Sequence, residues 1–246
     1  MFTTAIKEFL RVKNYPSFQL RAVFFDMDGV IFDSMKNHAI AWVQAMNDVN
    51  IPFTEQDAYM NEGRTGSSTV DGAFNKSLGR DSTEEEKQLI YKLKTTYFEK
   101  CGAAEKMPFT HELLNKIKQQ GLEIYVITGS GQLSLLDNLE SHFPGIFNKD
   151  KMVTAFDVTQ GKPFPEPYLK GLEISGFKPW EVLVVENAPL GVESAKAANL
   201  FTIGVNTGPL DSNELRKKGA DMIFSTMEEL YLNWDQFDYL STNETK

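Results

Sequence analysis

The chain has 246 residues, 41% of them hydrophobic and 12% aromatic, which is enough apolar material for one large domain or two modest ones and argues against disorder. The formal net charge is -9 and no basic run occurs, so nucleic acid and anionic membrane surfaces are poor partners. The single cysteine, Cys101, excludes an internal disulfide and a thiolate metal site, and no long apolar segment suits a transmembrane helix. We therefore expect a cytoplasmic protein, and we expect it to be a monomer.

The first segment, residues 1–20, predicts a short extension rather than a signal peptide, because charged side chains interrupt its apolar residues. Within it, residues 4–12 are expected to form a helix that packs on the edge of a sheet.

Apolar runs without polar alternation follow, and such runs are typical of strands buried on both faces of a parallel sheet. They cover residues 22–25, 122–127, 152–155, 182–185 and 201–205, and residues 220–224 add a short last strand. Helical patterns separate most of them, at residues 111–120, 132–143, 167–175 and 190–198. The alternation predicts an α/β fold with a doubly wound, mainly parallel, Rossmann-like sheet.

One interval, residues 34–105, breaks this alternation because it contains long helical patterns and no convincing strand. Its patterns cover residues 39–49, 55–61, 69–78 and 84–100. We expect a helical cap domain here, inserted between the two parts of a core domain, residues 21–33 and 106–240. Such an insertion would lie over the carboxyl ends of the strands, where open α/β sheets bind ligands.

Two carboxylates, Asp26 and Asp28, follow the first predicted strand. In extended geometry they point to the same side at the strand's end. One can attack phosphorus and form an aspartyl phosphate, while the other protonates the leaving oxygen and later deprotonates water. Taken alone, Asp-x-Asp-Gly is better explained as turn chemistry, so the interpretation depends on what accompanies it.

Two further clusters could bind phosphate. Thr128, Gly129 and Ser130 follow a buried strand and open a helix, so they can present N–H groups and hydroxyls to an anion; an ordinary capped helix is an equally good explanation. Lys162 lies in GKPFPEP, whose prolines stiffen the loop and can fix the lysine as a placed charge for a phosphoryl group, although most lysines are merely solvated.

Glu186 and Asn187 end the fourth strand and offer oxygen ligands for a divalent cation, with a polar loop as the alternative. With Asp26 and the backbone carbonyl of Asp28, they could bind magnesium together with waters and a phosphate oxygen. The four clusters in this order, each in a suitable setting, indicate magnesium-dependent phosphoryl transfer.

The segments that carry these clusters are DMDGVIFDS, ITGS, GKPFPEPY and VVENAPLGVESAKAA. They resemble the four motifs of the haloacid dehalogenase (HAD) superfamily, in its β-phosphoglucomutase-like branch with a helical cap, over roughly residues 21–230. The resemblance implies a flap at residues 29–34 whose closure with the cap expels water. It also implies these roles: Asp26 as nucleophile, Asp28 as general acid and base, Thr128 and Lys162 as phosphate-binding and charge-stabilising groups, and a magnesium site around Glu186.

Two departures from the branch bear on the substrate. Gly131 and Gln132 stand where the mutase has a Lys-Asn pair for the second phosphate of its substrate, which speaks against mutase activity. Asn187 replaces the second acid of the fourth motif and removes one negative charge beside the cation, which would suit a substrate that brings its own chelating oxygens. Together with EGRTG at residues 62–66 and the stretch 128–136, Asn187 resembles bacterial members of the branch that hydrolyse inorganic pyrophosphate.

Three residues of the predicted cap are candidates for substrate contact. Glu62 and Arg64 would face the core site when the cap closes, with Arg64 holding a distal phosphate and Glu62 holding water or excluding bulky leaving groups. A solvated helix end explains them equally well. His38 lies on the first cap helix near the hinge, where packing is the plainer interpretation and the resemblance implies contact with the active site.

The first hypothesis is a hydrolase that uses Mg2+ and an aspartyl phosphate at Asp26 to act on a small phosphorylated metabolite, inorganic pyrophosphate or a small phosphate ester. A sugar-phosphate mutase of the β-phosphoglucomutase type is the alternative. A phosphate-binding module without catalysis is the third hypothesis.

Overall fold

The computed structural model describes residues 2–131 and 133–237, and its core is a six-stranded sheet in the order β5-β4-β1-β6-β7-β8. The strands are β1 (Ala22–Phe25), β4 (Glu123–Ile127), β5 (Met152–Val153), β6 (Val182–Glu186), β7 (Phe201–Val205) and β8 (Met222–Phe224). Each neighbouring pair runs parallel. The predicted doubly wound α/β fold is confirmed.

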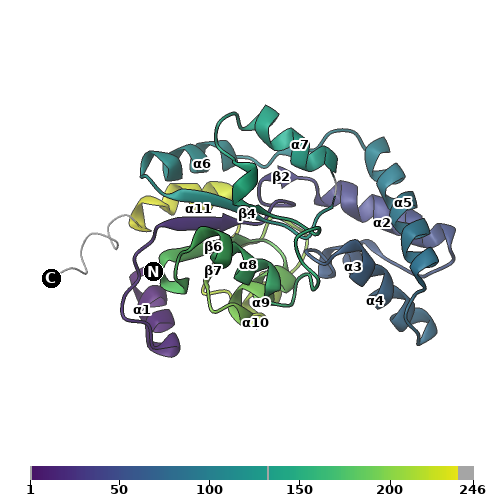
Figure 1. Cartoon of the computed structure of the whole chain (residues 1–246), viewed down its shortest axis with the longest axis horizontal. Coiled ribbons are helices and arrows are strands. Elements are labelled where there is room, and N and C mark those ends of the chain that lie inside the picture. The colour runs from purple at the N-terminus through teal and green to yellow at the C-terminus, as the bar shows by residue number, and fades with distance from the viewer. Residues whose placement is uncertain (1, 132, 238–246) are drawn as a thin grey trace.

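Alternate residues of the strands pack on opposite faces of the sheet. Val23 and Phe25 of β1 join a core cluster with α1, α6 and α11, whereas Ala22 and Phe24 join a second cluster with α8 and α9. Figure 1 shows α6 and α11 on one side of the sheet and α8, α9 and α10 on the other. Because both faces are covered, the strands are apolar throughout. The bounds of the core helices are α1 (Phe2–Lys13), α6 (Thr110–Gln119), α7 (Leu133–His142), α8 (Glu166–Ser175), α9 (Pro189–Ala197), α10 (Ser212–Lys217) and α11 (Met227–Asn233).

Helix α1 packs on the β7 and β8 end of the sheet through aromatic rings. Phe2 contacts Phe224 of β8 and Phe237, with ring centroids 5.8 Å and 4.0 Å apart, and Phe9 contacts Phe201 of β7 at 5.4 Å. Aromatic pairs at these separations stabilise beyond their buried area. The extension is therefore part of the core packing, and the helix predicted for residues 4–12 is slightly longer than expected.

Four consecutive helices, which we call the helical insertion (residues 35–100), lie between the first strand and α6. They are α2 (Met35–Asp48), α3 (Glu55–Met60), α4 (Gly66–Leu78) and α5 (Glu84–Lys100). Thr54 and Thr83 begin α3 and α5 with capping boxes, which satisfy N–H groups that the helix leaves unpaired. The insertion has its own hydrophobic cluster, which includes Trp42, Phe74 and Ile90. Figure 1 shows it beside the sheet rather than on either face.

A short antiparallel ribbon joins the insertion to the core. It pairs β2 (Phe32–Asp33) with β3 (Glu105–Lys106), and it was not predicted because two residues are too few to give a pattern. No helix in the described ranges is long and apolar enough to span a membrane.

Candidate active site

The carboxyl ends of three adjacent strands bring the predicted residues together. Asp26 directly follows β1, Thr128 follows β4 and Glu186 ends β6, and β1 lies between β4 and β6 in the sheet. Parallel strands all present their carboxyl ends at one edge, which is where open α/β sheets bind ligands. Lys162 reaches the same place from the loop before α8 and is only 1% exposed.

Lys162 binds two carboxylates at once. Its Nζ donates to Asp26 Oδ1 and to Glu186 Oε1, each at 2.5 Å, and to the carbonyl of Ile127 at 3.0 Å. The hydroxyl of Tyr168 donates to the same Glu186 oxygen at 2.6 Å. These side chains are buried, so each charge depends on the others for its stability.

The protonation of this cluster follows from its burial. Burial raises the pKa of Asp26 to about 8, against the opposing effect of Lys162. Burial also disfavours the charge on Lys162, but the two carboxylates outweigh it and raise the pKa of the ammonium, so it stays charged. The cluster therefore holds a fixed positive charge beside a carboxylate whose ionisation needs additional positive charge.

Asp28 has a separate set of partners. Ser34 Oγ donates to Asp28 Oδ1 at 2.6 Å, and His38 Nε2 lies 3.1 Å from the same oxygen. Burial acts to raise the pKa of Asp28, but His38 and Ser34 outweigh it and lower the pKa. Burial and the charge of Lys94 lower the pKa of His38. His38 thus contacts the predicted acid and base directly, in addition to packing on the ring of Phe98 at 4.4 Å.

The loop after β4 lines the pocket and, as expected, comes directly before a helix. Helix α7 begins at Leu133, and within the loop Thr128 Oγ1 accepts a hydrogen bond from the N–H of Ser130 at 3.0 Å. A Cβ on Gly129 would overlap the backbone of Gly63, so only glycine fits where the insertion crosses this loop. Gln132, one of the two positions that depart from the mutase, lies outside the described residues.

Asn187 has an oxygen that suits a cation. Its Nδ2 donates to Glu62 Oε1 at 2.7 Å, while Oδ1 is buried and has no hydrogen-bond partner among the described residues. Asn187 lies against Gly29, because a Cβ at Gly29 would overlap its amide group. An unsatisfied amide oxygen beside the Asp28–Gly29 turn fits the oxygen ligands that magnesium takes.

The remaining predicted metal ligands form no ready-made carboxylate cluster. Within residues 2–131 and 133–237, no group of three His, Cys, Asp or Glu side chains is arranged to hold a metal. Glu186 contacts Lys162 and Tyr168, so its role as a ligand stays a prediction. The candidate set combines Asp26, the Asp28 carbonyl and the Asn187 amide oxygen.

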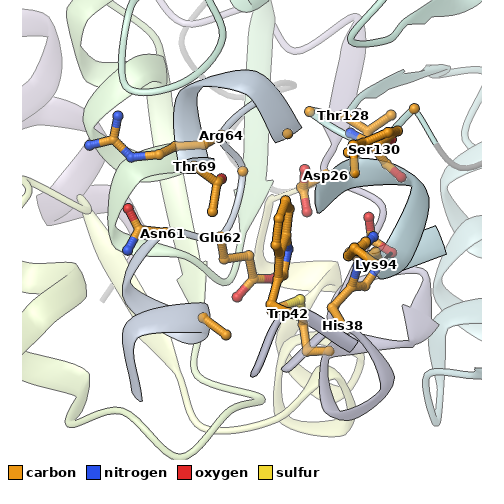
Figure 2. A pocket seen from close by; sticks show the side chains of 18 residues that line it. Asp26, His38, Trp42, Asn61, Glu62, Arg64, Thr69, Lys94, Thr128 and Ser130 are labelled. Atoms are coloured by element: carbon orange, nitrogen blue, oxygen red, sulfur yellow. Dashed lines mark hydrogen bonds and ion pairs between the residues drawn. The ribbon is translucent and has the colours of Figure 1, made fainter. Parts of the chain in front are cut away.

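The two predicted residues of the insertion differ in placement. Glu62 is buried against Asn187, and burial together with the charge of Asp26 raises its pKa well above the usual value. Figure 2 shows the Arg64 side chain pointing away from Asp26, and its Nη1 donates to Ser68 Oγ at 3.1 Å. The structure therefore brings Glu62 to the site and leaves the guanidinium of Arg64 away from the nucleophile.

A cavity of about 60 Å³ lies between the core loops and the insertion, lined by Asp26, Asp28 and Thr128 from the core (Figure 2). From the insertion it is lined by Trp42 and Lys94, which sequence reasoning missed. A signal for Lys94 exists, since it lies four residues from both Ile90 and Phe98 on the buried stripe of α5. Ser34 and Tyr168, also missed, lie inside the quoted motifs.

Two helical glycines provide a matched test of the cluster. A Cβ on Gly191 of α9 would overlap the Glu186 carboxylate, whereas one on Gly72 of α4 would meet nothing closer than an oxygen at 4.0 Å. Gly191→Ala is expected to displace Glu186 from Lys162 and to lower the free energy of unfolding by about 2 kcal/mol. Gly72→Ala is expected to raise the free energy of unfolding by about 0.5–1 kcal/mol through helix propensity. Urea denaturation of both variants measures the two effects, and equal effects would contradict the close packing of Gly191 on Glu186.

Comparison with known proteins finds relatives that cover most of this chain. A family model described as haloacid dehalogenase-like hydrolase matches residues 23–205. The β-phosphoglucomutase of Bacillus subtilis is 24% identical, covering 89% of this chain and 97% of its own. Glycerol-1-phosphate phosphohydrolase 1 of Saccharomyces cerevisiae is 31% identical, covering 87% and 85%.

One solved structure is much more similar. A protein from Bacteroides vulgatus, provisionally assigned as a β-phosphoglucomutase, superposes with a TM-score of 0.95 at 50% sequence identity over 98% of both chains. None of these three proteins is named as a pyrophosphatase, so that finer resemblance stays a prediction.

Proposed function

This chain belongs to the haloacid dehalogenase-like hydrolase family, and we propose that it is a phosphohydrolase that transfers a phosphoryl group from a small phosphorylated metabolite to Asp26 and then to water. The observation that supports this most is the contact of Asp26 with the buried Lys162, next to Thr128 and to a second aspartate in a different environment. Two carboxylates in unlike surroundings can take the two roles that the reaction needs. The finer proposal for the substrate is inorganic pyrophosphate or a small phosphate ester.

In the first step, a carboxylate oxygen of Asp26 forms a bond to phosphorus while the bond from phosphorus to the leaving oxygen breaks. Lys162 and the N–H groups around Thr128 offset the negative charge on the phosphoryl oxygens. Because His38 and Ser34 lower the pKa of Asp28, its carboxyl group must take up a proton when the substrate binds, and it then donates that proton to the leaving oxygen. Both described hydrogen bonds of its carboxyl group go to Oδ1, so Oδ2 is the oxygen placed to exchange the proton.

In the second step, Asp28 takes a proton from water, and the oxygen of that water attacks phosphorus. The bond between phosphorus and Asp26 breaks, which releases inorganic phosphate and restores the carboxylate. The neutral Ser34 and His38 contacts hold Asp28 in one orientation through both steps.

We propose that Asp26, the Asp28 carbonyl and Asn187 hold Mg2+, with Glu186 close by. When bound, the cation polarises the phosphoryl oxygens and favours the ionised form of Asp26. The high pKa of Asp26 in the protein alone and the unsatisfied Asn187 oxygen support this proposal.

Asn187→Asp is expected to lower the magnesium concentration at half-saturation several-fold, because a carboxylate binds the cation more strongly than an amide. It should also lower the activity on highly charged substrates, since it adds negative charge opposite Glu62. Magnesium titrations of activity on pyrophosphate and on a monoester measure both effects. An unchanged titration would remove Asn187 from the proposed ligand set.

The helical insertion is proposed to act as a cap that closes over the core site. Its loop lies against Gly129 and Lys162 of the core. A Cβ placed on Gly63 would overlap the Lys162 side chain, and one placed on Gly129 would overlap the backbone of Gly63. A phosphoryl group at Asp26 would then be shielded from bulk water.

The mutase is the second candidate, and the β-phosphoglucomutase relatives favour it. Against it, Gly131 offers no side chain to hold a second phosphate, and a Cβ placed there would lie 3.0 Å from the hydroxyl oxygen of Tyr91 and 3.4 Å from the ring of Phe156. A panel of phosphates at millimolar magnesium separates the two. Phosphate release from at least one compound, faster than any isomerisation of glucose 1-phosphate, is expected, and the reverse order would establish the mutase.

A further inference from the structure

A buried lysine that the reaction scheme does not use lies at the cavity. Lys94 of α5 is 3% exposed, and it lines the cavity together with Asp26 and Thr128. No carboxylate in the described ranges lies within ion-pair distance of its ammonium group. The charge of Asp28 attracts this ammonium group without forming an ion pair with it, and burial outweighs that attraction and lowers the pKa of Lys94 to about 7.

Aromatic rings hold this ammonium group in place. Its Nζ lies 4.9 Å from the ring centroid of Phe98, 5.5 Å from that of Trp42 and 5.9 Å from that of Tyr91. Cation–π contacts fix the position of the charge without neutralising it. An anion that enters the cavity would therefore meet an ammonium group whose position the aromatic rings already fix.

The same rings limit the size of what can enter. Figure 2 shows the Trp42 ring extending toward Asp26, and Tyr91 packs so closely on Gly66 that a Cβ there would overlap its ring. The space open to the centres of water-sized molecules is about 60 Å³, and Trp42 and Tyr91 form part of its lining. Arg64, the other cationic candidate, points away from Asp26 (Figure 2).

We propose that Lys94 is the leaving-group subsite and that it selects small leaving groups that carry negative charge, either a phosphate or a carboxylate. The proposal rests on the proposed function, because it assumes that a phosphoryl group is bound at Asp26. It deepens that function by naming the substrate class: compounds in which a second anionic group lies close to the phosphoryl group.

The test compares Lys94→Met, which keeps the length of the side chain among the rings, with Lys92→Met on the exposed face of the same helix. The substrates are inorganic pyrophosphate, 2-phosphoglycolate and ethyl phosphate, whose leaving groups are phosphate, glycolate, which carries a carboxylate, and ethanol, which is neutral and small. For Lys94→Met, kcat/KM is expected to fall about 10- to 100-fold for the charged leaving group that the subsite selects and less than about 3-fold for ethyl phosphate. For the Lys92→Met protein, kcat/KM should equal that of the parent protein for all three substrates.

Two further readouts separate recognition from a structural role. Lys94→Met should keep or raise the thermal midpoint at pH 7, because burial disfavours the charge that it removes more than Asp28 favours it. In the Asp26→Asn background, calorimetry should show weaker binding of the selected anion when Lys94 is also replaced. A fall confined to pyrophosphate identifies a phosphate leaving group, and one confined to 2-phosphoglycolate identifies a carboxylate.

An equal fall for all three substrates, or no fall for any, overturns the proposal for Lys94. The proposed function fails by a different result, namely that the parent protein releases phosphate from none of the three compounds and Asp26→Asn changes nothing.

Discussion

Replacing Asp26 with Asn is expected to lower kcat by at least about 10⁴-fold on every substrate that the parent protein hydrolyses, because the nucleophile is lost. The variant should still fold, since Asn has the same shape and Lys162 keeps Glu186 as its counter-ion at 2.5 Å. Phosphate release in a continuous assay measures the loss.

Thermal denaturation of the same preparation is the control, and ligand binding distinguishes the alternatives. A catalyst loses turnover in Asp26→Asn but retains affinity for its substrate. Turnover within about tenfold of the parent would mean that Asp26 does not form the covalent bond.

Replacing Lys162 with Met is expected to lower the free energy of unfolding at pH 7 by about 3–5 kcal/mol and to abolish activity. The variant leaves Asp26 and Glu186 buried beside each other without the ammonium group that binds both. Urea denaturation measures the loss, and the Asp26→Asn/Lys162→Met double variant should recover part of it because one carboxylate is gone.

The pH dependence of the Lys162→Met variant has a definite sign. The pKa of Asp26 is about 8 in the folded protein, above its value of 3.8 in the unfolded chain, and removing Lys162 raises it further. A group whose pKa rises on folding contributes stability below its unfolded pKa and loses it as the pH rises through the folded pKa. Between pH 4 and pH 8 Asp26 is protonated in both folded proteins, so its contribution should fall in parallel in the two, and the stability difference between variant and parent should widen as the pH rises above about 8. A stability difference that does not widen above pH 8 would contradict this account.

Much of the fold could be predicted because the strands that carry the site are buried on both faces. The run at residues 22–25 coincides with β1 (Ala22–Phe25), and 201–205 coincides with β7 (Phe201–Val205). Strands of this kind are apolar throughout, which also marks the polar residue at each carboxyl end. Asp26 and Glu186 were located in this way, although nothing in the order of residues indicated that Lys162 would bind both.

The contacts that could not be predicted from the sequence depend on the direction of side chains that lie far apart along the chain. The contact of Asn187 with Glu62 joins residues 125 positions apart, and the orientation of Arg64 is set by its bond to Ser68. Lys94 lies on the buried face of α5, between Ile90 and Phe98. That pattern indicates that the face is buried, but it does not indicate what the face packs against. Such contacts follow from how the insertion is seated on the core, and no local pattern encodes that placement.

Several buried groups at this site weaken the fold in the state without ligands. Glu62 has a pKa raised well above its usual value by burial, Asp26 has one near 8, and Lys94 has one near 7. Each is a group whose charge is disfavoured until something of opposite sign arrives. Ligand and metal binding should therefore raise the thermal midpoint appreciably.

The most direct test of the central claim is to trap the phosphoryl group on Asp26. Asp28→Asn removes the group that activates water, and acetyl phosphate carries a leaving group that needs no proton from Asp28. After incubation with magnesium and acid quenching, peptide mass spectrometry is expected to find one phosphoryl group on the peptide that contains Asp26. Release of phosphate by this variant with no phosphoryl group on that peptide at any time point would contradict a covalent intermediate at Asp26.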